Sequence, residues 1–146
     1  LVFVKNKFAN KGMLFEEYWL LMPCSPLLEV NDLRDAASNY NHRHGPMLSV
    51  SELPVPPQWV YVENANNGLC LATRGFHGSR SQDLKKGYYD CGAFAIFSPL
   101  DIEKGVFDGN EIQPYTLPRH RAVDIDTEDD WHFAETLYRV SREEAS

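Results

Sequence analysis

The sequence lacks several features that would assign it to a class at once. It contains no apolar run near the roughly 20 residues that a membrane-spanning helix needs, because its longest apolar run, around Trp19 to Pro23, has the length of a strand. Basic residues are few: 14 against 21 acidic residues give a net charge of −7, whereas nucleic-acid-binding domains usually carry a basic face. We therefore expect neither a membrane nor a nucleic-acid partner.

Cysteine and glycine motifs are also scarce. The three cysteines are odd in number, and their spacing matches neither a zinc site nor a redox pair. We interpret them as free thiols, which predicts a reducing, cytoplasmic location. No glycine-rich phosphate loop and no N-terminal signal pattern occur. The sequence begins with Leu1 and not Met, so we expect either that the original start was removed or that this is part of a longer chain.

What is present is enough for one globular domain over residues 1–146, with 43% hydrophobic residues. Tyr18 to Met22 is a short apolar run that predicts a buried strand, and Met47 to Val50 predicts another. Between them, Asn31 is a candidate N-cap. It precedes an apolar face at helical spacing: Leu33, Ala36, Ala37 and Tyr40. This strand, helix, strand order predicts an α/β protein with a parallel crossover.

The rest of the chain predicts a hairpin, further strands and a final helix. Asn64 to Gly68 separates two short apolar runs and predicts a β-hairpin extension over residues 58–73. Further strands are expected at 93–97, 112–117 and 122–125. Thr127, with Asp130 three residues later, is expected to cap a helix that ends near Arg142. Its inward side should comprise Trp131, Ala134, Leu137, Tyr138 and Ser141.

Two acidic residues near the C-terminus form the sharpest chemical feature. If 122–125 is a strand, Asp124 and Asp126 point to the same side and Ile125 points into the core. Adjacent carboxylates repel unless a cation lies between them, and Mg²⁺ commonly takes one or two protein carboxylates plus substrate phosphates. An acidic first helical turn explains Glu128 to Asp130 but not the earlier pair. From spacing alone, a metal site and a solvated loop remain equally good interpretations.

A polar run from Arg80 to Leu84 leads into Tyr88 and Gly92. An arginine on a loop can hold a carboxylate or phosphate through two parallel hydrogen bonds, and Gly92 would let the backbone approach a ligand closely. By composition alone, a solvated loop that enters a strand is the favoured interpretation.

Three blocks, taken together, resemble the nonulosonic-acid cytidylyltransferases, which include acylneuraminate and pseudaminic acid cytidylyltransferase. The blocks, in the family's order, are Leu20-Leu21-Met22-Pro23-Cys24-Ser25-Pro26-Leu27-Leu28, then Arg80-Ser81-Gln82-Asp83-Leu84 with Tyr88-Tyr89-Asp90-Cys91-Gly92-Ala93-Phe94, then Val123-Asp124-Ile125-Asp126-Thr127-Glu128-Asp129-Asp130-Trp131 with Ala134-Glu135. The second block is more similar to the pseudaminic branch. The likeness spans roughly Tyr18 to Tyr138.

The resemblance implies a three-layer α/β/α nucleotide-diphospho-sugar transferase-like fold with a mostly parallel sheet. It implies transfer of CMP from CTP to a nine-carbon sugar acid with Mg²⁺, in which the anomeric hydroxyl attacks the α-phosphate and positioning supplies most of the catalysis. On the matching positions, Asp124 and Asp126 are the expected catalytic and metal-binding residues. The expected substrate-binding residues are Arg80, Gln82, Ser25 and Tyr88.

The family also has an N-terminal phosphate-binding loop of the type Ala-Arg-x-Gly-Ser-Lys, which does not occur here. We therefore expect this sequence to correspond to the C-terminal part of such an enzyme and to turn over CTP poorly alone. Met22, Cys24 and Leu28 depart from the sialic branch. The family is typically a homodimer whose hairpin reaches the partner; here the hairpin is the candidate arm, or simply a sheet edge.

Two other functions remain open from the sequence. One is a non-catalytic dimeric binding or interaction module derived from the family. The other is a self-contained Mg²⁺-dependent phosphohydrolase that uses Asp124 and Asp126, for which Asp90 is the one further acidic ligand that can be named.

Overall fold

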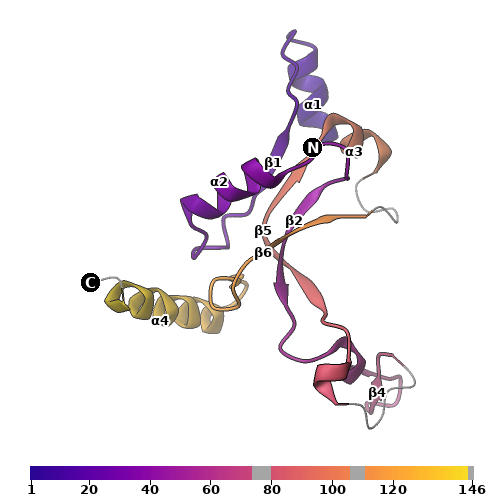
Figure 1. Cartoon of the computed structure of the whole chain (residues 1–146), viewed down its shortest axis with the longest axis vertical. Coiled ribbons are helices and arrows are strands. Elements are labelled where there is room, and N and C mark those ends of the chain that lie inside the picture. The colour runs from indigo at the N-terminus through magenta and orange to yellow at the C-terminus, as the bar shows by residue number, and fades with distance from the viewer. Residues whose placement is uncertain (74–79, 106–110, 145–146) are drawn as a thin grey trace.

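The computed structural model describes residues 1–73, 80–105 and 111–144. Helices and strands alternate along much of the chain (Figure 1). In order, the elements are α1 (Val2–Ala9), β1 (Tyr18–Leu21), α2 (Val30–Asn39), β2 (Met47–Glu52), a 3₁₀ turn (Pro57–Trp59), β3 (Tyr61–Glu63), β4 (Leu69–Leu71), a second 3₁₀ turn (Ser81–Asp83), β5 (Tyr88–Phe97), α3 (Pro99–Lys104), β6 (Gln113–Thr116) and α4 (Glu128–Glu144).

Four strands form a mixed sheet in the order β1-β5-β2-β6. β5 is antiparallel to both β1 and β2, and β2 is parallel to β6. The α/β class is therefore confirmed. The expected mostly parallel sheet needs correction: β1, β2 and β6 run the same way, but β5 lies between β1 and β2, so two of the three neighbouring pairs are antiparallel. The crossover through α2 joins strands that are not neighbours.

The core lies on both faces of the central strands. On one face, Ala36 of α2 and Tyr40, which follows the helix, pack with Met47 and Ile96. On the other, Ile102 of α3 belongs to a cluster with Leu48, Val50, Ala95 and Phe97. The helices thus cover opposite faces, as the alternation of side chains along a strand requires.

β1 is less buried than its apolar sequence predicted. Tyr18 is buried, but Leu20 and Leu21 are 43% and 51% exposed. The reason is that β1 is an edge strand whose one neighbour in the described sheet is β5. An apolar run alone does not distinguish an edge from a central strand.

A bulge interrupts β5 at Gly92. The pairing of β2 with β5 shifts register between Leu48 and Val50, and Gly92 has a φ of +64°, a left-handed conformation that glycine adopts without strain. The buried Oγ of Ser49 accepts hydrogen bonds from the N–H groups of Ala93 and Phe94, at 3.1 and 2.9 Å. The bulge is therefore a supported feature, and it brings β5 to the candidate site.

The expected hairpin is confirmed as the separate antiparallel pair β3–β4, which lies apart from the four-stranded sheet in Figure 1. Asn64 closes its turn, because its side-chain oxygen accepts from the N–H groups of Asn66 and Gly68. Residues 74–79, which follow the hairpin, lie outside the described residues, and the expected polar loop from Arg80 contains a 3₁₀ turn, Ser81–Asp83.

Three local expectations need comment. Glu29, not Asn31, precedes the first turn of α2, and its N–H donates to Asp32. The expected strand at 122–125 is wrong, because residues 117–127 contain turns and irregular backbone only. The cap of α4 is confirmed: Thr127 and Asp130 exchange hydrogen bonds. On its expected inward side, Ala134 is buried while Trp131 and Tyr138 remain about half exposed.

Candidate functional site

Segments from the three sequence blocks meet beside Gly92. The N–H of Ile125 donates to the carbonyl of Cys24 at 3.0 Å, and the hydroxyl of Ser25 donates to the carbonyl of Gly92 at 3.4 Å. A Cβ added to Gly92 would lie 3.4 Å from Oδ2 of Asp124. The turn after β1, the bulge of β5 and the segment before α4 therefore form one cluster, although they are far apart in the sequence.

Asp124 is the chemically unusual member of this cluster. Its Oδ1 is buried and has no hydrogen-bond partner among the described residues. A buried carboxylate oxygen is costly to leave unpaired. Such an atom is suited to a cation or to a donor on a ligand.

The thiol of Cys24 lies in acidic surroundings. Its pKa is raised, chiefly by a hydrogen bond to Asp124, then by partial burial and by the negative charges of Asp124 and Asp126. The expectation that the two carboxylates point to the same side of a strand is wrong. The two lie in irregular backbone beside the Cys24 turn, not on one side of a strand.

These residues fit a magnesium ion whose coordination shell is completed by substrate phosphates and water. In the described ranges, no group of three or more His, Cys, Asp and Glu side chains is placed to hold a metal. Mg²⁺ commonly takes one or two carboxylates and completes its shell with water and phosphate oxygens. Asp124, with its unpaired buried oxygen, and the exposed Asp126 are donors of that type. Asp90, the further ligand considered for a phosphohydrolase, instead accepts the N–H of Gly92 at 2.9 Å.

The other expected substrate residues lie elsewhere. Gln82 lines a hollow with Glu52, the last residue of β2, and with residues of the segment that follows, among them Pro54. Tyr88 begins β5 opposite Glu52, and its side chain is 51% exposed. Arg80 is also exposed. The structure thus brings Ser25 to the Asp124 cluster. The 3₁₀ turn Ser81–Asp83 and the start of β5, which carry Gln82 and Tyr88, lie at the hairpin end of the molecule (Figure 1), and Arg80 directly precedes that turn.

Sequence reasoning missed an ion pair close to the site. Arg121 pairs with Asp32 of α2 at 2.5 Å and with Glu29 at 3.3 Å. Arg121 and Asp32 are 89 positions apart. No local pattern connects them, so only the folded chain reveals the contact.

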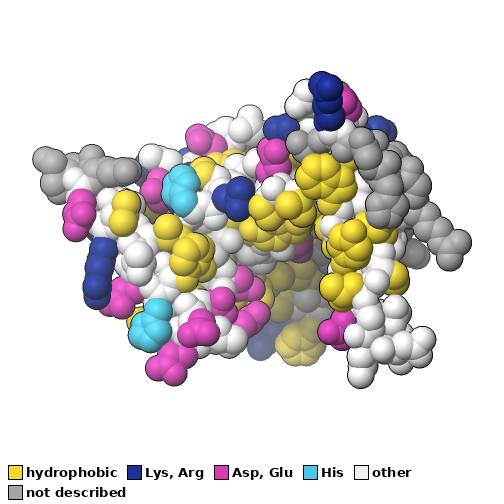
Figure 2. All heavy atoms as spheres, turned by 90° about the horizontal axis from the view of Figure 1, so that it is seen from below, with side chains coloured by type: hydrophobic (Ala, Val, Ile, Leu, Met, Phe, Trp, Pro, Cys, Tyr) yellow, Lys and Arg dark blue, Asp and Glu magenta, His cyan; other side chains and the backbone are white. Residues whose placement is uncertain are grey.

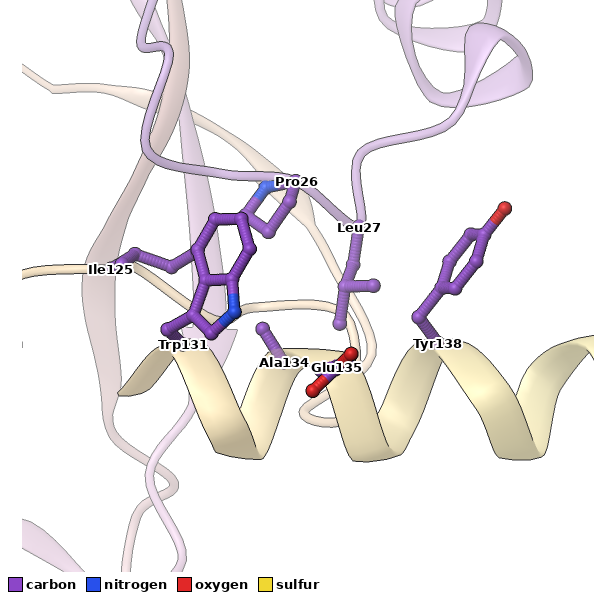
Figure 3. Close-up of a pocket in the computed structure, with 7 residues that line it drawn as sticks. All are labelled: Pro26, Leu27, Ile125, Trp131, Ala134, Glu135 and Tyr138. Carbon is purple, nitrogen blue, oxygen red and sulfur yellow. The ribbon is translucent and has the colours of Figure 1, made fainter. Parts of the chain in front are cut away.

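An apolar hollow of about 260 Å³ has Ile125 as one of its lining residues. Figure 3 shows Pro26 and Leu27 from the turn after β1 facing side chains of α4, with Ile125 at one end. The α4 residues are Trp131, Ala134, Glu135 and Tyr138. The half-exposed face of α4 therefore opens onto this hollow.

The surface is uneven in character. Figure 2 shows acidic side chains gathered on the α4 side of the molecule and hydrophobic side chains gathered on the side of the hairpin. No helix in the described part of the chain has both the length and the apolar character needed to cross a membrane.

Comparison with known proteins agrees with the resemblance carried by the three blocks. No protein-family model matches the chain. Two curated proteins from Campylobacter jejuni subsp. jejuni, serotypes O:23/36 and O:2, are 31% and 30% identical to it over 138 residues. The alignment covers 93% of this chain and 60% of each relative. The chain is therefore related, over nearly its whole length, to the nonulosonic-acid cytidylyltransferase family.

Both relatives are named pseudaminic acid cytidylyltransferase. The likeness to the pseudaminic branch, first carried by the second sequence block, is thus confirmed. The chain spans about 60% of the length of these curated relatives, which is consistent with the expectation that it corresponds to part of such an enzyme.

Proposed function

We propose that this chain carries the metal-binding part of an active site that transfers CMP from CTP to a nonulosonic acid of the pseudaminic type. The observation that carries the proposal is the buried Oδ1 of Asp124, which has no hydrogen-bond partner among the described residues; a second acidic residue, Asp126, follows two positions later. The relatives named for this activity align with this chain over 138 residues, 93% of its length. The three-layer fold of the family is part of the same proposal.

The chain's own residues contribute position and charge. When bound, Mg²⁺ neutralises charge that develops on the transferred phosphate and orients the phosphates. Asp124 and Asp126 are the residues that would hold it. The contacts between Ile125 and Cys24 and between Ser25 and Gly92 fix the neighbouring backbone, so that Asp124 is placed before substrate arrives.

Arg80, Gln82 and Tyr88 belong to this proposal as sugar-binding residues that act in a homodimer. They lie near the hairpin, whose side chains Tyr61, Val62 and Leu69 are all about half exposed or more. An arm that reaches a second copy would cover this apolar surface and carry the substrate residues towards the partner's carboxylates. CTP and a sugar acid are the substrates, and a reducing cytoplasm, in which three free cysteines persist, is the location.

Activity of these 146 residues alone should be weak or absent. They contain no glycine-rich phosphate-binding loop, and such a loop supplies the backbone N–H groups that hold nucleotide phosphates. The chain's own residues thus support metal binding, whereas turnover of CTP needs further groups that hold the phosphates.

Metal binding by Mn²⁺ electron paramagnetic resonance tests the proposal directly. We expect the unaltered chain to bind Mn²⁺, and Asp124→Asn and Asp126→Asn to lose most of that binding. Asp129→Asn, in the exposed first turn of α4, is the matched control and should bind normally. Failure of the unaltered chain to bind Mn²⁺, or undiminished binding by Asp126→Asn, would refute the metal site.

A non-catalytic dimeric module is the second candidate, favoured by the exposed apolar hairpin. It predicts a stable dimer in analytical ultracentrifugation with no shift of thermal stability on adding Mn²⁺. A dimer that is lost in Leu69→Lys, together with absent metal binding, would favour this function over the first. A monomer at high concentration would exclude it.

A further inference from the structure

The segment that carries the two carboxylates has no regular structure to hold it. β6 ends at Thr116 and α4 begins at Glu128, and the residues between form only turns and irregular backbone. One tether is the hydrogen bond from Ile125 to Cys24. A carboxylate that must meet a metal within a few tenths of an ångström needs more support than one backbone bond.

Arg121 supplies a second tether. It lies three residues before Asp124, in a turn where its N–H donates to the carbonyl of Pro118 at 2.8 Å. Its guanidinium crosses to α2, where it contacts Asp32 at 2.5 Å and Glu29 at 3.3 Å. The segment is thus held at Arg121 and at Ile125, with Asp124 between these two points.

The Asp32 end of this contact is firmly anchored. Asp32 is only 4% exposed, and besides Arg121 it accepts the hydroxyl of Tyr115 at 3.2 Å and the N–H of Glu29 at 2.9 Å. Burial together with the charge of Asp32 raises the pKa of Tyr115 to about 12. Asp32 therefore joins α2, β6 and the carboxylate-bearing segment at one buried point.

We propose that Arg121 is a positioning residue for the metal-binding carboxylates, acting through its ion pair with Asp32. It does not touch the metal. It fixes the backbone before Asp124, so that Asp124 stays beside Gly92 and Cys24 without a strand to hold it. The inference rests on the proposed metal-binding function and adds the residue that makes the site rigid.

A purely structural ion pair and a positioning ion pair make different predictions. One guanidinium nitrogen of Arg121, Nη1, contacts both Asp32 and Glu29, and its position is fixed by the rigid plane of the guanidinium, whereas a lysine ammonium is a point charge on a flexible stem. Arg121→Lys keeps the charge and so keeps the fold, but lets the segment move. If the pair only stabilises the fold, the folded variant binds metal normally; if it positions Asp124, the folded variant binds metal more weakly.

The experiment measures Mn²⁺ affinity by electron paramagnetic resonance, and metal-free stability by thermal denaturation, on the full chain. We expect Arg121→Lys, and independently Asp32→Glu, to lower Mn²⁺ affinity by about 10-fold or more, as changes to residues that orient metal ligands do. Arg139→Lys is the matched control, because it alters the exposed pair with Glu135 on α4 and should leave affinity unchanged.

The outcomes separate this inference from the proposed function. If the unaltered chain binds Mn²⁺ and both variants, folded, bind it equally well, the positioning role is overturned while the metal site stands. If the unaltered chain does not bind Mn²⁺, the proposed function and this inference are both overturned. Weaker binding by both folded variants, with Arg139→Lys unaffected, supports the inference.

Discussion

Gly92→Ala is the substitution that tests most of the site's geometry at once. Gly92 forms the bulge of β5 with a φ of +64°, and an added Cβ would contact Asp124, at 3.4 Å from Oδ2 and 3.8 Å from Cγ. The new methyl group would therefore have two separate effects, one on the backbone and one on the carboxylate.

The backbone effect can be estimated. A left-handed conformation costs a non-glycine residue roughly 1–2 kcal/mol. At this chain length, 1 kcal/mol lowers Tm by about 2–4 °C, so we expect Gly92→Ala to lower Tm by about 2–8 °C. A contact at 3.4 Å is ordinary van der Waals distance and should add little to this loss.

The effect on the site should be larger than the effect on stability. A methyl group against the Asp124 carboxylate occupies space that a cation or its water would use, so Mn²⁺ affinity should fall by about 10-fold or more. Gly12→Ala is the matched control, because Gly12 has a φ of +76° with nothing near its Cβ position. It should lose similar stability and no affinity.

Thermal denaturation followed by circular dichroism, with Mn²⁺ binding on the same samples, makes both measurements. Equal stability of Gly92→Ala and the unaltered protein would contradict the left-handed bulge. Unchanged Mn²⁺ affinity in Gly92→Ala, in a protein that does bind Mn²⁺, would contradict the placement of Gly92 against the metal-binding carboxylate.

Two further predictions concern the fold around the site. Ser49→Ala should lower the free energy of unfolding, measured in urea, by about 2–4 kcal/mol, because it leaves the buried N–H groups of Ala93 and Phe94 without their acceptor. Ser51→Ala is the control: it removes one hydrogen bond to Leu117 and should lower the free energy of unfolding clearly less. Equal losses in the two variants would contradict the role of Ser49 in the bulge. Burial, followed by the nearby charge of Asp101, raises the pKa of Tyr40 to about 12, so the folded state favours the neutral phenol. The stability that this preference contributes is fully present below the ordinary tyrosine pKa near 10. It is lost as the pH rises from 10 through 12. Tyr40 and Tyr115 both have a pKa of about 12, so the phenolate absorbance that appears in this range should fall by one tyrosine in Tyr40→Phe. An unchanged titration curve in that variant would contradict the prediction.

Features that depend on neighbouring residues could be predicted from the sequence. The cap formed by Thr127 and Asp130 and the hairpin turn closed by Asn64 are examples, because the interacting groups lie within a few positions of one another. The motif blocks also indicated the family that the comparisons support. The metal role of Asp124 and Asp126 was predicted and remains to be tested.

Features that depend on partners far along the chain could not. The apolar run at 122–125 resembled a strand, and Val123 is indeed buried, but no strand of the described sheet pairs with it. The same holds for Arg80, Gln82 and Tyr88, whose place at the hairpin end depends on the course of β5. Periodicity shows that a side chain is buried, not what buries it.

The amino-acid sequence by itself determined the α/β class, the final helix and its cap, the hairpin and the relation to the cytidylyltransferases, since these follow from short-range patterns and motif order. Only the tertiary structure decided that β5 separates β1 from β2, that Gly92 bulges towards Asp124, and that Arg121 pairs with Asp32 across 89 positions. Each of these depends on long-range packing and on the need to pair buried charges, and such forces act between residues that the linear pattern does not connect.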